Sequence, residues 1–352
     1  MSRYLPRSRP GLPLLRRGRD RIQVGLDPRT AVVVDRLSDL ASAALLRLDG
    51  TRTLAEIAEL QPGLGSLLEE LHAGGLLQDD PGQTSAVSAH RRERYAEDLA
   101  AWGLGRSTAA AQRLLARRGR ATVVVRGDDR AAAHVAVGLA AAGVGTVALE
   151  GSDRAVAPSD LTPVAPFEPD LPWREQVAAA VRAQGARPSP ASVRGLRPSA
   201  VVVCSSADAD LPWTDPELAN DLLADGVPHL AVAVAGSTAL VGPFVLPGAS
   251  ACLWCLDHRN RDADPAWPAL TDQLRLHHPR SRASLGISAA AAAAVAVAHT
   301  LQVVDDGPSA QPASVNAQVE LRAPDLLALR RPVVRHPACG CGWAGVGSTM
   351  VS

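Results

Sequence analysis

Residues 121–150 read ATVVVRGDDRAAAHVAVGLAAAGVGTVALE, and this stretch decides the fold. An apolar run over 121–125 is followed by a short polar turn and by a helical stretch that extends to Ala142. Glycines at 143 and 145 end the helix, and a second apolar run follows over 146–149. Two strands joined by a helix in this order predict a βαβ unit, in which the strands are parallel.

The rest of the second half of the chain continues this pattern. Apolar strands are expected at Ala200–Cys204 and His229–Ala235, with a helix near 216–223 between them. A long alanine-rich helix is expected over 286–304, whereas 151–198 is proline-rich and carries no clear pattern. Strongly apolar strands that alternate with helices indicate helices on both faces of the sheet. The predicted fold class is therefore α/β, with a Rossmann-like, mainly parallel sheet.

The first 80 residues are predicted to form a small domain of their own. Two β-prone runs over 21–26 and 30–37 precede three short helices, an order that resembles a winged helix. Ser38 and Thr53 are expected to cap the first two helices, and Glu56 completes a capping box with Thr53. The predicted division is a domain over 1–80, a linker and helix over 81–111, and an α/β domain over 112–352.

Composition excludes several classes of partner. The chain has 36 basic and 36 acidic residues, so its net charge of zero gives no general attraction to nucleic acid or membrane. Every one of the basic residues is arginine, so no lysine ammonium can bind phosphate or form a Schiff base. No secretory signal is visible over 1–21, and the alanine-rich 286–304 is expected to be a buried helix rather than a span. We therefore expect a cytoplasmic protein with no nucleic-acid or membrane partner.

Four of the five cysteines form two close pairs. Cys252 and Cys255 are spaced as C-x-x-C, and Cys339 and Cys341 as C-x-C. Two such pairs suit a tetrahedral zinc ion that has no open coordination position and that ties the C-terminal segment to the body of the protein. His336 is an alternative ligand. A redox pair at the C-x-x-C, or two unrelated pairs, remain as alternatives to structural zinc.

The turn after the first strand is a poor phosphate-binding loop. It holds one glycine, Gly127, where a nucleotide loop needs several, and Asp128 and Asp129 would repel a phosphate. Glu150 ends the second strand, where a ribose-binding carboxylate or a solvated residue would be found. We therefore expect a degenerate nucleotide site that does not bind ATP productively. Its candidate residues are Gly127, Arg130, Glu150 and Asp208.

Several motifs in the second half resemble one family. VGPFVLPG at 241–248, CLWCL at 252–256 and DPAWP at 264–268 are similar to the ThiF-like, cyclodehydratase-associated proteins of thiazole/oxazole-modified peptide biosynthesis. These proteins belong to the ubiquitin-activating-type adenylyltransferase superfamily, and the resemblance covers roughly 112–352. Active members carry a G-x-G-x-x-G loop and an acidic residue after a later strand. Here the loop is lost, and the acidic position falls on Ala207, with Asp208 one place off.

The first domain resembles the leader-peptide recognition element of such systems. LPLLRRG at 12–18, QVG at 23–25 and LDGTRT at 48–53 carry this likeness. Such elements bind a leader peptide as an added strand, and residues 1–30 hold eight arginines and two aspartates, which would attract an acidic leader. A structural domain, another protein contact and a DNA-reading winged helix are alternatives. The candidate peptide-binding residues are Arg16, Arg17, Arg21, Gln23, Val24, Val32, Val33 and Val34.

Three functions follow from these features. The first is a non-catalytic partner that binds a precursor peptide and presents it to a separate YcaO-type cyclodehydratase, as in bacteriocin-like biosynthesis. The second is an active ATP-dependent adenylyltransferase that acts on a peptide or protein carboxylate. The third is a housekeeping interaction scaffold on the same fold. The resemblance is compatible with a homodimer, which nothing in the sequence itself decides.

Overall fold

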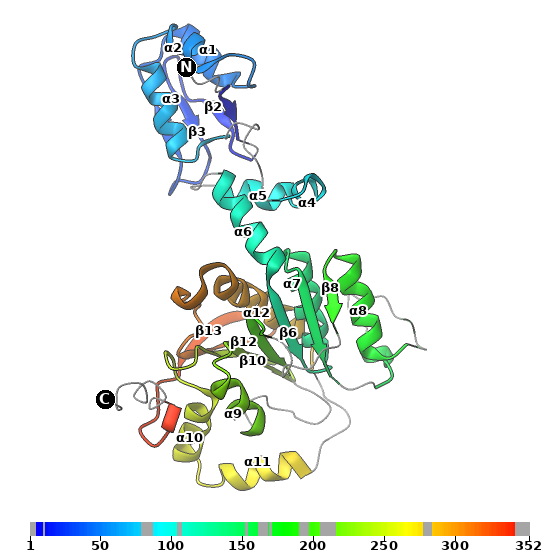
Figure 1. Ribbon diagram of the computed structural model, residues 1–352. Helices are drawn as coiled ribbons and strands as arrows, with labels where there is room; N and C mark the ends of the chain where they lie inside the picture. Colours follow the sequence, from blue (N-terminus) through cyan, green and yellow to red (C-terminus); the bar gives the residue numbers. More distant parts are fainter. Residues whose placement is uncertain are drawn as a thin grey trace, which may run out of the picture. The chain divides into compact units, whose positions relative to one another are not determined.

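The computed structural model describes residues 5–9, 11–78, 87–103, 108–151, 154–160, 168, 171–189, 197–204, 216–276 and 284–341. The chain divides into two compact units, Met1–Ala116 and Arg117–Ser352, both drawn in Figure 1. The three-part division at 80/81 and 111/112 stays a prediction.

The N-terminal unit contains a small antiparallel sheet in the order β2-β3-β4. Its strands are β2 (Leu14–Arg16), β3 (Ile22–Val24) and β4 (Val32–Val34). A second pairing joins β1 (Arg7–Ser8) to β5 (Leu77–Gln78). The sequence indicated β3 and β4 but neither β2 nor the β1–β5 pair, because strands of two or three residues leave almost no alternating pattern.

Three short helices pack on this sheet through one apolar cluster. They are α1 (Asp39–Leu46), α2 (Leu54–Ala58) and α3 (Leu64–Ala73). Both expected caps are present: the Ala41 N–H donates to Ser38 Oγ at 3.1 Å, and Thr53 and Glu56 form the capping box. The cluster includes Ile22, Val34, Leu37, Leu45, Ile57, Leu68 and Leu71.

The helical segment that follows is divided into α4 (Ala89–Arg94), α5 (Ala96–Gly103) and α6 (Thr108–Arg120). The sequence indicates a helix over 96–118, and α5 and most of α6 lie in this stretch, with 104–107 outside the described residues. The Gly103 carbonyl accepts a hydrogen bond from the buried Arg9 guanidinium.

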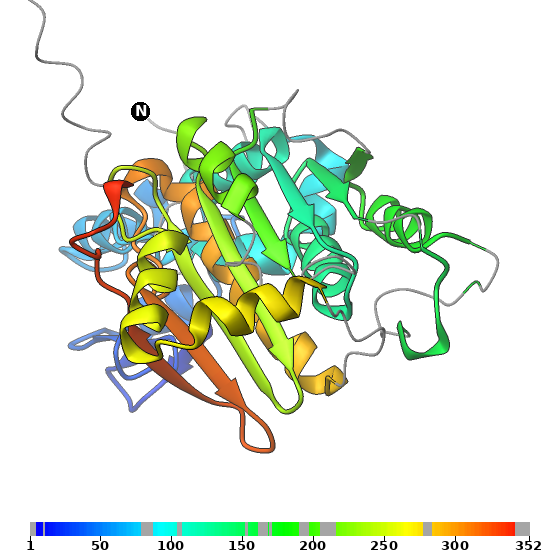
Figure 2. The ribbon, with the colours of Figure 1, turned by 90° about the horizontal axis from the view of Figure 1, so that it is seen from below.

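The C-terminal unit is built on an eight-stranded sheet in the order β13-β12-β11-β10-β9-β6-β7-β8 (Figure 2). Five neighbouring strands are parallel, which confirms the predicted α/β class. These five are β6 (Thr122–Arg126), β7 (Thr146–Glu150), β8 (Arg187–Ser189), β9 (Ala200–Cys204) and β10 (His229–Ala235).

Three antiparallel strands complete the sheet, and the sequence did not predict them. They are β11 (Thr238–Val245), β12 (Ala317–Arg322) and β13 (Leu327–Pro332). β11 contains Gly242 and Pro243, residues that argue against a strand in a sequence pattern. β12 and β13 carry charged side chains, as strands at the end of a sheet can.

Helices cover both faces of this sheet. One face packs against α7 (Arg130–Ala141) and α12 (Gly286–Asp306). The other packs against α9 (Pro216–Ala224) and α10 (Leu253–Ala263), with α11 (Trp267–Leu276) next in the chain. The unpatterned stretch contains η1 (Pro158–Asp160), α8 (Trp173–Ala183) and β8, and η4 (Gly307–Ser309) follows α12.

α12 belongs to the core of the C-terminal unit. The segment Gly286–Ser309 is long and apolar enough to cross a membrane, yet half of its apolar window is buried inside the protein. α12 contacts α7, β10 and β11, and alanines 289, 292, 293 and 296 are buried there. Small side chains let α7 and α12 approach closely: a Cβ on Gly138 would lie 3.0 Å from Val297. These contacts are those of a core helix.

A buried ion pair anchors the C-terminal end of α12. Arg118 Nε donates to Asp305 Oδ1 at 2.9 Å, and both side chains are about one-tenth exposed or less. Removing one member of a buried pair leaves the other charge without compensation.

We expect Asp305→Ala to lower the free energy of unfolding by about 3–5 kcal/mol in denaturant titrations. The matched control is Asp306→Ala at the exposed neighbour, which should change it by less than about 0.5 kcal/mol. Equal effects of the two variants would contradict this role for the pair.

Candidate functional site

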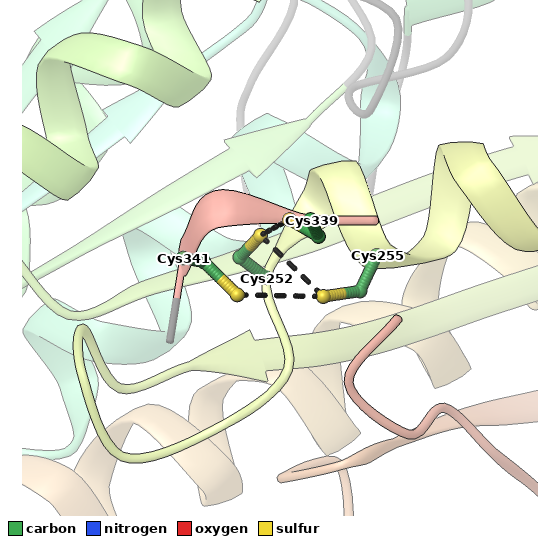
Figure 3. Close-up of side chains that lie close together, drawn as sticks. All are labelled: Cys252, Cys255, Cys339 and Cys341. Carbon is green, nitrogen blue, oxygen red and sulfur yellow. Dashed lines mark hydrogen bonds between the residues drawn. The ribbon is translucent and has the colours of Figure 1, made fainter. Parts of the chain in front are cut away.

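The four paired cysteines meet at one point of the C-terminal unit (Figure 3). Cys252 precedes α10, Cys255 lies in its first turn, and Cys339 and Cys341 follow β13. The sulfur–sulfur distances are 3.8 Å for 252–255, 3.6 Å for 252–339 and 3.5 Å for 255–341. All four sulfurs lie within 4.8 Å of one another, which brings both predicted pairs together.

This spacing suits a metal ion better than disulfides. A disulfide needs its sulfurs about 2.05 Å apart, whereas zinc with bonds of about 2.3 Å places four tetrahedral sulfurs roughly 3.8 Å apart. Three of the cysteines are buried and Cys341 is half-buried. The four cysteines could therefore hold a metal such as zinc, through protein thiolates alone. Such a donor set belongs to structural sites, which keep no position open for a substrate.

The pKa values of the clustered cysteines also favour a bound cation. The Cys252 thiol donates to Cys255, and this hydrogen bond lowers the pKa of Cys255 to about 4. The same hydrogen bond, with burial, raises the pKa of Cys252 far above its usual range. Burial and the contact with Cys255 raise the pKa of Cys341 to about 11. Four neighbouring thiolates are therefore unfavourable by themselves, and a divalent cation would stabilise them.

Two tryptophans anchor the helices beside the cysteines. Trp254 Nε1 donates to Asn220 Oδ1 at 2.9 Å, which joins α10 to α9. Trp267 Nε1 donates to Asp257 Oδ1 at 2.9 Å, which joins α11 to α10. Arg261 Nε pairs with the other oxygen of Asp257 at 2.7 Å, so that this buried carboxylate is compensated.

His336 lies outside the four-sulfur group. Its Nε2 is 2.8 Å from Asp262 Oδ2, and its Nδ1 accepts the Ala338 N–H at 3.1 Å. The ring stacks on His258 with centroids 4.8 Å apart. Both ring nitrogens are thus engaged, and four cysteines already fill a tetrahedral donor set, so the alternative ligand role of His336 is not needed.

The loop after β6 places a carboxylate where a phosphate would bind. Asp129 is the N-cap of α7 and accepts the Ala132 N–H at 2.8 Å. A helix N-terminus binds anions through such backbone donors, so this side chain takes one of them. Gly127 has a φ of 122°, and its N–H donates to the Glu150 carbonyl at 2.7 Å. Gly127 and Glu150 therefore meet at the carboxyl ends of β6 and β7.

The remaining charges around the loop are paired with one another. Asp128 is buried, and its Oδ2 lies 3.7 Å from Arg154 Nε. Arg154 also binds Asp160 at 2.6 Å. Sequence reasoning missed Arg154 and Asp160, because both lie in the unpatterned stretch. The candidate Arg130 begins α7, and its NH1 donates to the Ser284 carbonyl at 3.2 Å.

Asp208 and Ala207 lie outside the described residues. The arrangement around Asp208 therefore stays a prediction from the sequence. Arg126 and Glu150 are opposite each other on β6 and β7, and Arg126 NH1 lies 3.8 Å from Glu150 Oε2.

The peptide-binding candidates occupy different places in the small sheet. β3 pairs with β2 on one side and with β4 on the other, so Gln23 and Val24 lie on the central strand. The candidates Gln23 and Val24 therefore do not lie at a strand edge, where an added peptide strand would pair. Within the part of the chain that the structure describes, the sheet has its edges at β2, which holds Arg16, and at β4.

Two of the three residues of β4 are partly exposed. Val32 and Val33 are 36% and 45% exposed, whereas Val34 is buried in the core of the unit. Val33 faces outward with Leu15 and Gln23, since these residues are opposite one another in the register. β4 therefore offers an apolar, partly exposed edge.

Arginines surround the turn between β2 and β3. Arg16, Arg17 and Arg21 are exposed, and Arg17 NH1 donates to Gln23 Oε1 at 2.7 Å. A cavity of about 360 Å³ adjoins β2. It is lined by Ser8, Arg9, Gly11, Leu12, Pro13, Leu14 and Leu46.

No family model and no curated protein matches this chain. Solved structures do match it. The E. coli MccB structure with ATP is 17% identical, with a TM-score of 0.67 over 96% of this chain and 99% of MccB. The microcin C7 biosynthetic enzyme MccB in complex with N-formylated MccA is 16% identical, with the same TM-score and coverage. PaaA is 16% identical, with a TM-score of 0.68 over 92% of this chain and 99% of PaaA.

The likeness to these structures defines the fold. The chain has an MccB-like α/β fold with a mainly parallel central sheet, and a four-cysteine cluster lies in its C-terminal unit.

The cluster predicts a bound zinc ion. We expect the purified chain to hold one zinc per molecule, as measured by inductively coupled plasma mass spectrometry, because its four thiols form a complete tetrahedral donor set. Cys252→Ser or Cys339→Ser should lose most of the metal and lower the unfolding temperature. Cys204→Ala, which changes the one cysteine outside the cluster, is the control and should keep the zinc. Full zinc occupancy in Cys252→Ser would contradict the site.

Proposed function

We propose that this chain is a cytoplasmic, non-catalytic protein that captures a precursor peptide and presents it to a separate YcaO-type cyclodehydratase. The observation that carries the proposal is the match to MccB over nearly the whole chain, including the N-terminal unit. MccB was solved with the peptide MccA bound. Here the N-terminal unit has the features that capture of a peptide requires.

The small sheet of the N-terminal unit supports capture by strand addition. An edge strand presents unpaired backbone N–H and C=O groups, which an extended peptide can pair with. β4 adds exposed apolar side chains for contact, and the arginines at 16, 17 and 21 add positive charge near β2. Positive charge speeds association with an acidic peptide and disfavours a basic one. The ligand class is therefore an extended, acidic peptide.

The loop after β6 supports a role without adenylation. It has one glycine, Asp129 caps the helix where a phosphate would bind, and the buried Asp128 adds a second negative charge. The arginines near these carboxylates make contacts with protein groups, and the chain has no lysine to replace them. A nucleoside triphosphate would have to displace the contacts of these arginines. Its phosphates would also approach the carboxylates of Asp128 and Asp129, which costs electrostatic free energy.

The cysteine cluster has a structural role in this proposal. A zinc ion there would supply no catalytic step, because its four ligands are all protein thiolates. The chain's own residues hold two segments in place: Cys252 and Cys255 at the start of α10, and Cys339 and Cys341 after β13.

The alternative function is adenylation of a peptide carboxylate, favoured by the match to MccB solved with ATP.

Binding of a leader peptide to the full chain tests the proposal. The probe is a fluorescein-labelled leader from the precursor gene nearest to the gene of this chain, measured by fluorescence anisotropy. The wild type should bind it, and the triple variant Arg16→Glu, Arg17→Glu, Arg21→Glu should bind at least about tenfold more weakly, because about 1.4 kcal/mol of electrostatic attraction is lost.

A matched variant controls for net charge. The triple variant Arg47→Glu, Arg52→Glu, Arg94→Glu reverses three exposed arginines elsewhere in the same unit, and its affinity should stay within about twofold of wild type. Absence of wild-type binding would contradict peptide capture. Equal losses in both variants would show a general charge effect rather than a site.

A further inference from the structure

One of the four clustered cysteines is more accessible than the others. Cys252 and Cys255 are completely buried and Cys339 is 8% exposed, whereas Cys341 is half-buried. Peroxides oxidise thiolates, and accessibility decides which thiolate of a group reacts first. The fifth cysteine, Cys204, is buried at the end of β9 and lies outside the cluster. An oxidant that approaches the cluster from solvent therefore meets Cys341 first.

A second sulfur lies within reach of Cys341. The Sγ atoms of Cys255 and Cys341 are 3.5 Å apart, the shortest of the three sulfur–sulfur contacts described above (Figure 3). A disulfide holds its sulfurs about 2.05 Å apart, so the two atoms would have to approach by roughly 1.5 Å. Cys255 lies in the first turn of α10 and Cys341 follows β13. A bond between them would join the same two segments that a shared metal ion would join.

We propose that Cys341 is a site of modification by peroxide and that Cys255 resolves it, so that oxidation replaces the metal link with a disulfide. The inference goes beyond peptide capture and does not depend on it. Only Cys252 and Cys339 would remain as thiolates, whereas a structural zinc site uses four ligands. Oxidation therefore releases the metal, and the C-terminal segment stays attached to α10.

The oxidation has two steps, and hydrogen peroxide supplies the oxygen. The Cys341 thiolate attacks the peroxide, the O–O bond breaks, and a sulfenic acid and one hydroxide form. The Cys255 thiolate then attacks the Cys341 sulfur, so that an S–S bond forms as the S–O bond breaks and a second hydroxide leaves. Two thiolates have then lost two electrons, and one peroxide has been reduced to two hydroxides. A thiol or phosphine reductant reverses the change.

The other possible pairs are less suited to this reaction. The Sγ atoms of Cys252 and Cys255 are 3.8 Å apart, and both side chains are completely buried, so peroxide reaches neither of them first. A disulfide within this C-x-x-C would also leave the C-terminal segment with no covalent link to α10. A disulfide between Cys339 and Cys341 would close a ring over Gly340 alone, and such short loops resist closure.

Digestion after mild oxidation distinguishes these bonds. The full, zinc-loaded chain is treated with one equivalent of hydrogen peroxide, alkylated and digested with trypsin, which here cleaves only after arginine because the chain has no lysine. Cleavage after Arg335 gives the fragment 336–352, which contains Cys339 and Cys341. Tandem mass spectrometry should show this fragment joined to the one with Cys255, through a 255–341 disulfide. The dye pyridylazoresorcinol should report the loss of the bound zinc in the same sample.

Reciprocal variants separate the two roles. In Cys255→Ser the resolving sulfur is absent, so the sulfenic acid on Cys341 should persist long enough for dimedone to label it. In Cys341→Ser the accessible sulfur is absent, and Cys255 should stay unlabelled and uncross-linked. Cys204→Ala is the control and should form the same disulfide as wild type. Treatment of oxidised wild type with a phosphine reductant and zinc should restore its metal content.

Three results would overturn the proposal. They are a first disulfide between any other pair of cysteines, dimedone on Cys255 rather than Cys341, and zinc that stays bound while peroxide is present in excess. A 255–341 disulfide in a chain that does not bind the labelled leader would leave the proposal standing and remove peptide capture alone.

Discussion

The convergence of four cysteine sulfurs on one point is the constraint on which the C-terminal half of the structure depends. The sulfurs of two C-terminal cysteines lie within 4.8 Å of the pair at the start of α10, yet more than eighty residues separate the pairs. The segment after β13 is also held by hydrogen bonds from Arg335 to the Ser250 carbonyl and between His336 and Asp262. A metal ion bound by these four thiolates would hold this segment in place, because metal binding contributes folding free energy. The cysteines therefore fix the far end of the sheet as well as α10.

The residue at the N-terminus of α7 distinguishes this chain from a working nucleotide site. The parallel strands, the loop after β6 and the helix that follows are in the places that a nucleotide fold requires. The residue that begins the helix is nevertheless an aspartate, whose carboxylate accepts a backbone N–H that a phosphate would use. One helix N-terminus cannot serve both anions. We therefore propose that the MccB-like framework serves peptide binding at the small N-terminal sheet rather than nucleotide chemistry.

The sequence predicted the parts of the structure that depend on local pattern. The apolar runs at Ala200–Cys204 and His229–Ala235 are strands with those bounds, because buried parallel strands are apolar at every position. Ser38 and Thr53 are caps, because their side chains reach donors within the same turn. The cysteine pairs were recognised from spacing, although their meeting is a property of the fold.

Other features depend on contacts that no local pattern records. β11 was missed because Gly242 and Pro243 interrupt it, and β13 because its exposed arginines conceal a strand at the edge of a sheet. The central place of β3 follows from β2, a strand of three residues. Arg154 compensates Asp128 from a stretch without periodicity. Strand order and charge pairing are set by long-range packing, which a single sequence does not show.

We propose that this MccB-like framework captures a peptide without activating it. ATP–pyrophosphate exchange by the purified, zinc-loaded chain measures activation most directly, with the leader-bearing precursor present and absent. The account predicts exchange no faster than in buffer under both conditions, since the helix after β6 is capped by its own carboxylate. Exchange that rises when the precursor is added would contradict it and would make the protein an adenylyltransferase.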